Sequence, residues 1–129
     1  MAEPDLTVKY GVQLGLPEGG GAVVTEKADI EPLAIEAFRR HLRSCSTLPA
    51  AVARTDKVRI VLRAFFVPDG SLRTTPTLIE ASASIKGPLL MQAAIQALQA
   101  CQPYTMLPAD RYQEWKVLDL VFTPQDFAG

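Results

Sequence analysis

Apolar and polar residues alternate with two different periods along this chain of 129 residues. A period near 3.6 runs through residues 29–45 and again through residues 88–101, and it predicts two amphipathic helices. A period of two runs through residues 58–66, 77–83 and 117–122, and it predicts three strands. The predicted order is therefore helix, strand, strand, helix, strand.

Each predicted helix has one apolar face. In the first, Asp29 is expected to cap the N-terminus, with Pro32 in the first turn, and the apolar face carries Ile35, Phe38, Leu42 and Cys45. In the second, a glutamine stripe lies opposite Leu90, Ala94, Ala97 and Cys101. Both cysteines are thus expected to point inward, near the C-terminal ends of their helices.

The stretch "PDGS" at residues 68–71 predicts a tight turn, with proline supplying a fixed φ and glycine the left-handed position. The two strands beside it must then pair antiparallel. We expect a two-layer α+β fold in which two helices cover one face of a three-stranded antiparallel sheet. A short helix is expected just before the last strand.

The first 28 residues differ from the rest of the chain. Pro17 and the glycines at residues 19–21 favour a flexible leader or linker over residues 1–28. Within it Val8, Tyr10, Val12 and Leu14 alternate with other residues like a strand, although glycine interrupts the pattern. We expect residues 29–129 to form the folded domain.

Composition excludes several classes of protein. The formal net charge of −1 gives no electrostatic footprint for nucleic acid. Arg59, Arg63 and Phe65 are the residues that a base-stacking sheet would use, but a single aromatic makes a poor platform. No apolar run approaches the ~20 residues that span a bilayer, and the N-terminus lacks the pattern of a signal peptide. We expect a cytosolic protein or a domain of a longer exported or anchored chain.

Candidate catalytic pairs are weak. His41 and Cys45 lie four apart on a helix, as half of a metal site or a Cys–His pair would, but only one histidine is present in the chain. Asp110 and Glu114 are also four apart, and acids are common in the first turns of a helix. No phosphate loop and no nucleophile-elbow motif occurs. We therefore predict no enzyme activity, no metal and no cofactor.

The stretch "CQPYTMLPADRYQEWK", residues 101–116, is the richest in specific side chains. Pro103 should end the second helix, and Tyr112 and Trp115 should share one face of the short helix with their polar tips in water. With Tyr104, these residues are predicted to form a structural lid on the core. The pattern leaves two alternatives for Cys45 and Cys101: a disulfide, or two buried thiols.

Three stretches resemble one family. "HLRSCSTLP", "VRIVLRAFFVPDGSL" and "ALQACQPYTMLPADRYQEWKVLDLVFTP" are similar to the C-terminal periplasmic domain of TolA of the alphaproteobacterial type. The resemblance covers about residues 30–127, and the last stretch is its most specific part. Ser46 departs from it, because tryptophan is expected beside the cysteine.

The resemblance implies a protein-interaction domain in the Tol-Pal system, which links energy from the inner membrane to partners at the outer membrane during envelope constriction. Those partners are TolB and Pal, with TolQ and TolR acting through a membrane anchor that would lie outside this chain. Filamentous-phage coat proteins and colicins exploit some members of the family. The implied location is the periplasm, where an oxidising environment favours the disulfide. We expect the isolated domain to be a monomer that binds no nucleic acid.

The fold is shared with the C-terminal domain of TonB, whose partners add a β-strand. We therefore expect a partner segment to pair with an exposed edge of the last strand. The residues of that predicted edge are Val117, Leu118, Asp119, Leu120, Val121 and Phe122. The alternatives are a TonB-like energy-transduction domain and an α+β module that binds a small ligand in a deep, mostly apolar cavity.

Overall fold

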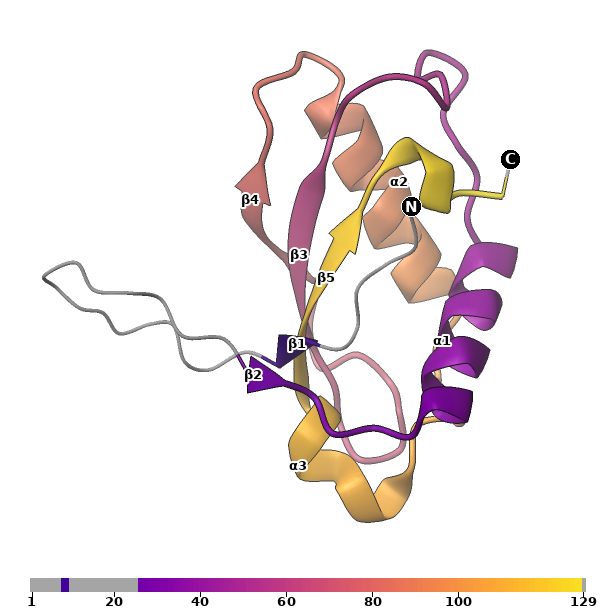
Figure 1. Cartoon of the computed structure of the whole chain (residues 1–129), viewed down its shortest axis with the longest axis vertical. Helices are drawn as coiled ribbons and strands as arrows, with labels where there is room; N and C mark the ends of the chain where they lie inside the picture. The colour runs from indigo at the N-terminus through magenta and orange to yellow at the C-terminus, as the bar shows by residue number, and fades with distance from the viewer. Residues whose placement is uncertain (1–7, 10–25, 129) are drawn as a thin grey trace, which may run out of the picture.

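The computed structural model describes Val8–Lys9 and residues 26–128 (Figure 1). Its longer elements follow the predicted order: α1 (Pro32–Ser44), β3 (Ile60–Phe65), β4 (Thr77–Ala81), α2 (Gly87–Ala100) and β5 (Val117–Phe122). The expected short helix is a 3₁₀ turn at Ala109–Arg111 followed by α3 (Tyr112–Trp115), and another 3₁₀ turn, Pro124–Asp126, follows β5. The α+β class is confirmed.

The central sheet consists of three antiparallel strands with β3 in the middle. β5 runs beside β3 over its whole length, from Ile60 opposite Phe122 to Phe65 opposite Val117. β4 pairs with the other side of β3, with a shift of register between Val61 and Leu62. This is the antiparallel sheet that the hairpin pattern predicted.

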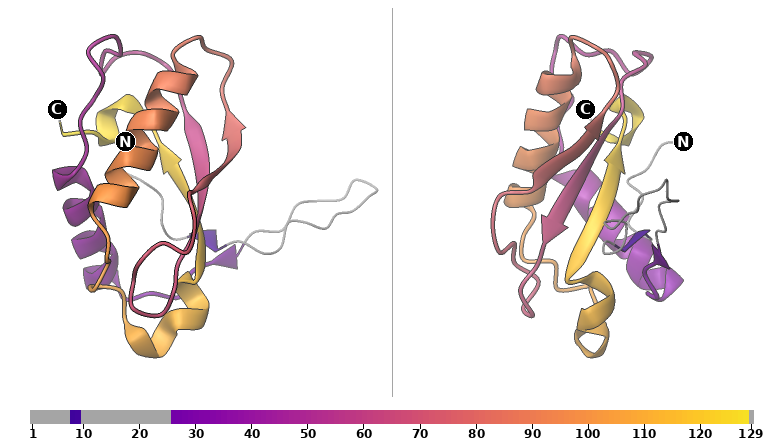
Figure 2. Two further views of the ribbon diagram at one scale, coloured as in Figure 1. Left: turned by 180° about the vertical axis from the view of Figure 1, so that it is seen from behind. Right: turned by 90° about the vertical axis from the view of Figure 1, so that its left-hand side faces the viewer.

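Alternating residues of the strands and the apolar faces of the helices build one core. α2 lies along one face of the sheet, and α1 packs beside it on the β5 side (Figures 1 and 2). The buried side chains that the sequence pattern predicted include Phe38, Leu42, Ile60, Leu62, Ala64, Phe66, Leu90, Ala94, Ala97, Leu118, Leu120 and Phe122. The periods of the two helices, of β3 and of β5 therefore identified inward-facing residues correctly, whereas all five residues of β4 are exposed.

Two short strands extend the sheet beyond β5. β1 (Val8–Lys9) pairs antiparallel with β5, and β2 (Glu26–Lys27) pairs antiparallel with β1. The order of the described sheet is thus β2-β1-β5-β3-β4. Both short strands come from the predicted leader, whose other strand-like positions Tyr10, Val12 and Leu14 lie outside the described residues.

The prediction that Asp29 caps α1 is wrong. The helix begins at Pro32 with Glu31 at the capping position, and no side chain caps it. Proline fixes φ at the first helical position and keeps the preceding residue extended, so the helix starts here. The Asp29 carboxylate instead pairs with Arg111 at 2.9 Å. None of the described helices is long and apolar enough to cross a membrane.

Candidate functional site

The predicted edge strand β5 has a backbone partner on both sides. Leu118, Leu120 and Phe122 are buried towards the helices, whereas Val117 and Val121 are partly exposed. On the side away from β3, Leu118 pairs with Lys9 and Asp119 pairs with Val8. No described residue pairs with residues 120–122 on that side. The chain's own strand β1 therefore covers part of the predicted edge.

Asp119 lies at the centre of β5 and forms an ion pair within the sheet. Its two carboxylate oxygens accept hydrogen bonds from Nε and Nη2 of Arg63 at 2.8 and 3.1 Å. The two residues are direct neighbours across β3 and β5, and their side chains are only 9% and 14% exposed. A bidentate contact of this kind fixes both side chains, so Arg63 is held within the sheet. Opposite charges on two predicted strands were its only signal in the sequence, and the register of β3 against β5 is what makes them face each other.

The outer strand β4 is an edge that the sequence analysis did not propose as a site. All five of its residues are exposed, and Leu78 and Ile79 are 43% and 41% exposed. Within the described chain, β4 pairs only with β3. Two adjacent apolar residues in a predicted strand, Leu78 and Ile79, were its signal in the sequence. Adjacent residues of a strand face opposite sides of the sheet and cannot both be buried by one layer of helices.

The connector between α2 and β5 packs its aromatic residues into the end of the core. Tyr104 is fully buried, with its ring centroid 4.9 Å from that of Phe38 and 5.6 Å from that of Phe66. Its hydroxyl donates to the carbonyl of Leu98 at 2.7 Å. Burial raises the pKa of the Tyr104 phenol above its ordinary value of 10.0. Pro103, by contrast, is exposed.

The expectation that the tips of Tyr112 and Trp115 lie in water is wrong. The Tyr112 hydroxyl donates to the carbonyl of Phe66 at 2.7 Å, and Trp115 Nε1 donates to the carbonyl of Pro108 at the same distance. The two rings pack edge to face, with centroids 4.9 Å apart. Both polar groups thus satisfy backbone carbonyls that would otherwise need water.

The β3–β4 hairpin is docked against this connector. Gly70 has the predicted positive φ, +92°, and its carbonyl accepts a hydrogen bond from the Tyr104 amide at 2.8 Å. The Gln102 side chain accepts a second hydrogen bond, from the Leu72 amide, at 2.7 Å. A Cβ on Gly70 would lie 2.7–2.9 Å from backbone atoms of Tyr104. The connector and the hairpin tip are therefore in contact through their backbones.

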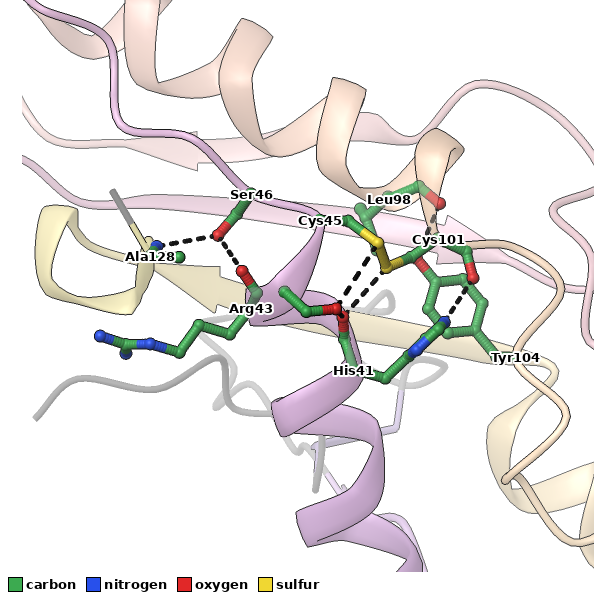
Figure 3. The surroundings of a disulfide bond; sticks show 9 residues. His41, Arg43, Cys45, Ser46, Leu98, Cys101, Tyr104 and Ala128 are labelled. Carbon is green, nitrogen blue, oxygen red and sulfur yellow. Dashed lines mark hydrogen bonds between the residues drawn. A yellow bond between two sulfur atoms is a disulfide. The ribbon is translucent and has the colours of Figure 1, made fainter.

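The structure contains the disulfide Cys45–Cys101, which joins the C-terminal ends of α1 and α2 (Figure 3). The Cα atoms of the two cysteines are 5.8 Å apart. Beside it, Nε2 of His41 lies 2.8 Å from the carbonyl oxygen of Cys101. Of the two alternatives left by the sequence, the disulfide is confirmed.

Ser46, the residue that departs from the family resemblance, is buried next to this bridge. Its hydroxyl donates to the carbonyl of Arg43 at 2.8 Å and accepts from the amide of Ala128 at 3.1 Å (Figure 3). The serine therefore ties the end of α1 to the C-terminal segment. A tryptophan could not make these two short contacts.

The candidate acid pair Asp110 and Glu114 lies at the start of the short helix before β5. Asp110 is exposed, and Glu114 accepts a hydrogen bond from the amide of Asp29 at 3.0 Å. This contact holds the segment before α1 against α3, which is a structural role.

Two surface hollows, of about 480 and 420 Å³, bear on the small-ligand alternative. The first is lined by Arg54, Lys57 and Arg59 among other mainly polar residues, and also by Asp56. The pKa of Asp56 is lowered, chiefly by its hydrogen bond with Lys86 at 2.7 Å and then by one from the Ala53 amide. Charged side chains contribute to both hollows, and the first is open to solvent, unlike the deep cavity that a small-molecule site needs.

Comparison of the chain with protein-family models, with curated proteins and with solved structures gives no match. The TolA-like assignment therefore stays a prediction that rests on the motifs of the sequence.

Proposed function

We propose that this chain is a non-enzymatic protein-interaction domain that binds an extended segment of a partner as an added strand beside β5. The observation that carries the proposal is the antiparallel pairing of Val8–Lys9 with Leu118 and Asp119. This segment, far away in the sequence, occupies the place that a partner strand would take. An edge that accepts one extended segment through its backbone can accept another.

The side chains of β5 indicate which partner segments would fit. Val117, Asp119 and Val121 alternate with the three residues that point into the core, so they share the face of the sheet away from α2. A strand added beside β5 would meet two partly exposed valines with the Asp119–Arg63 ion pair between them. Apolar side chains flanking a polar one would match this surface.

The particular role that we propose is that of a TolA-like domain, with TolB and Pal as partners and with TolQ and TolR acting through an anchor outside this chain. The order of elements, the "CQPYTMLP" connector and the Cys45–Cys101 bridge support this role. The bridge also supports a periplasmic location, because disulfides persist in oxidising compartments. A TonB-like energy-transduction domain remains the alternative with the same mode of binding.

Proline substitutions in the oxidised full chain test the site, with the flexible N-terminal segment of TolB as the ligand in calorimetry. Val121→Pro removes a backbone donor from β5 and should weaken binding at least about tenfold. Asp119 is unsuitable for this purpose, because proline there would also break the ion pair with Arg63. Ile79→Pro in β4 is the matched control and should leave the affinity unchanged. Circular dichroism shows whether each variant is folded.

The competing strand β1 offers an independent test. Val8→Pro should release the edge of β5 and strengthen partner binding on the order of fivefold, because about 1 kcal/mol of backbone pairing no longer competes. If Ile79→Pro weakens binding while Val121→Pro does not, the partner binds at β4 and its exposed Leu78 and Ile79. If neither substitution has an effect, strand addition is wrong.

A further inference from the structure

The ends of α1 and α2 bring together three groups that can bind a metal ion. A ring nitrogen of His41 and the sulfur atoms of Cys45 and Cys101 all lie within 4.8 Å of one another. Figure 3 shows them around the disulfide, with His41 on the last turn of α1 and the two cysteines directly after α1 and α2. Cys45 and His41 are only partly buried, so an ion from solvent can reach the cluster.

The hydrogen bond of His41 leaves its other ring nitrogen able to bind a metal ion. A backbone carbonyl can only accept, so at the 2.8 Å contact Nε2 of His41 must donate its proton to the oxygen of Cys101. In the neutral ring the lone pair is then on Nδ1. Metal-binding histidines commonly donate their other ring N–H to a carbonyl in this way, which fixes the ring orientation.

In the oxidised chain the sulfur atoms are bonded to each other and carry no negative charge. A two-electron reductant such as a water-soluble phosphine breaks the S–S bond. The phosphorus is oxidised to the phosphine oxide with the oxygen of one water molecule, and the two hydrogens of that water end on the two thiols. Binding of a divalent ion then releases both thiol protons, because thiolate is the form that coordinates metal.

We propose that the reduced chain binds a zinc-type divalent ion through Cys45, Cys101 and His41, with water in a fourth position. Two thiolates and one neutral imidazole match the charge and the donor preference of Zn²⁺. With Zn–S distances of about 2.3 Å, a tetrahedral site needs the sulfurs roughly 3.8 Å apart. Side-chain rotation can supply this change, because the Cα atoms are already 5.8 Å apart. The disulfide and the metal site exclude each other, so redox state decides whether the ion binds.

The ion would replace the covalent link between the two helix ends. In the oxidised chain the bridge holds the ends of α1 and α2 together, and in the reduced chain the ion holds the same residues. The reduced chain should therefore be more stable with Zn²⁺ than without it, and the oxidised chain should not respond. This inference does not depend on the proposed partner or on strand addition.

Cobalt is the spectroscopic probe of the test, which uses the full chain. The phosphine-reduced chain with Co²⁺ should show sulfur-to-cobalt charge-transfer absorption and the visible bands of a tetrahedral site, and Zn²⁺ should abolish both. The oxidised chain should show neither. Amide NMR of the reduced chain with Zn²⁺ shows whether the fold of the oxidised chain is kept.

His41→Gln is the matched variant. Its side-chain amide can still donate to the Cys101 carbonyl and both cysteines remain, but the imidazole ligand is lost. We expect its cobalt affinity, when reduced, to fall at least about tenfold. Equal affinity in the variant would overturn the three-ligand site. So would a folded reduced chain without cobalt bands, or a reduced chain that does not fold with Zn²⁺.

Discussion

Replacing Gly70 by alanine should destabilise the chain, whereas the same replacement at Gly87 should stabilise it slightly. Gly70 has φ of +92°, which costs an L-residue about 1–2 kcal/mol. Its new Cβ would also meet the oxygen, nitrogen and carbon of Tyr104 at 2.7, 2.8 and 2.9 Å. These are backbone atoms, so the hairpin tip or the connector must move.

That movement weakens the hydrogen bond from the Tyr104 amide to the Gly70 carbonyl, now 2.8 Å long, which contributes about 1 kcal/mol. The two effects together predict a loss of about 2–3 kcal/mol for Gly70→Ala. Gly87, in the first turn of α2, has no such constraint, since the nearest atom to an added Cβ is the Ser82 oxygen at 4.0 Å. Gly87→Ala should gain roughly 0.5–1 kcal/mol by restricting the unfolded chain.

Urea denaturation of the two oxidised variants measures both values, with the slope of the free energy of unfolding against urea as a check that the two-state description holds. If the free energy of unfolding of Gly70→Ala lies within about 0.5 kcal/mol of that of the original chain, the reasoning is refuted, because ordinary surface substitutions change it by no more than this. The hairpin would then not be docked against the connector. If Gly87→Ala destabilises the chain as much as Gly70→Ala does, the loss comes from replacing a glycine as such and not from the contacts around Gly70.

The remaining predictions concern the other contacts of the connector and the helix ends. Replacing Cys45 and Cys101 together by alanine should lower the free energy of unfolding by about 4 kcal/mol. The disulfide closes a loop across a separation of 56 residues, and without it the unfolded chain gains conformational entropy. A loss below about 1 kcal/mol in urea denaturation would contradict this. Tyr104→Phe should cost about 1–2 kcal/mol at pH 7, because the Leu98 carbonyl loses its 2.7 Å donor. The pKa of Tyr104 is higher in the folded chain than its ordinary value of 10.0. The stability that the neutral Tyr104 phenol gives the folded chain is therefore present below pH 10.0. It is lost as the pH rises further, because Tyr104 of the unfolded chain ionises first. The free energy of unfolding of Tyr104→Phe should therefore fall less steeply than that of the original chain above pH 10.0, and parallel curves would contradict this.

Local patterns predicted the regular elements well, because their signals lie within each segment. The second helix, expected at residues 88–101, is observed at Gly87–Ala100, and its glutamine stripe is exposed as the period required. The last strand has the predicted bounds, Val117–Phe122. Gly70 has the left-handed conformation that the turn motif indicated.

Contacts between distant segments could not be predicted in the same way. The Arg63–Asp119 ion pair joins residues 56 apart and depends on the register of β3 against β5. The pairing of Val8–Lys9 with β5 likewise depends on where the leader enters the sheet. The sequence showed that Cys45 and Cys101 face inward, but the disulfide depends on how the two helix ends meet.

The hydrogen bonds of the aromatic tips were missed for a related reason. Periodicity showed that Tyr112 and Trp115 share a face, but not that carbonyls of Phe66 and Pro108 lie within reach. Asp29 was misassigned because a capping preference is weaker than the constraint that Pro32 places on the start of the helix.

The central claim, strand addition at β5, is tested most directly by an amide-NMR titration of the oxidised chain with the flexible N-terminal segment of TolB. We predict saturable shifts that cluster on residues 117–122 and on Val8–Lys9, because the partner strand displaces β1 from β5. Shifts confined to Thr77–Ala81 would move the site to β4. No shifts at millimolar peptide would contradict the proposed function.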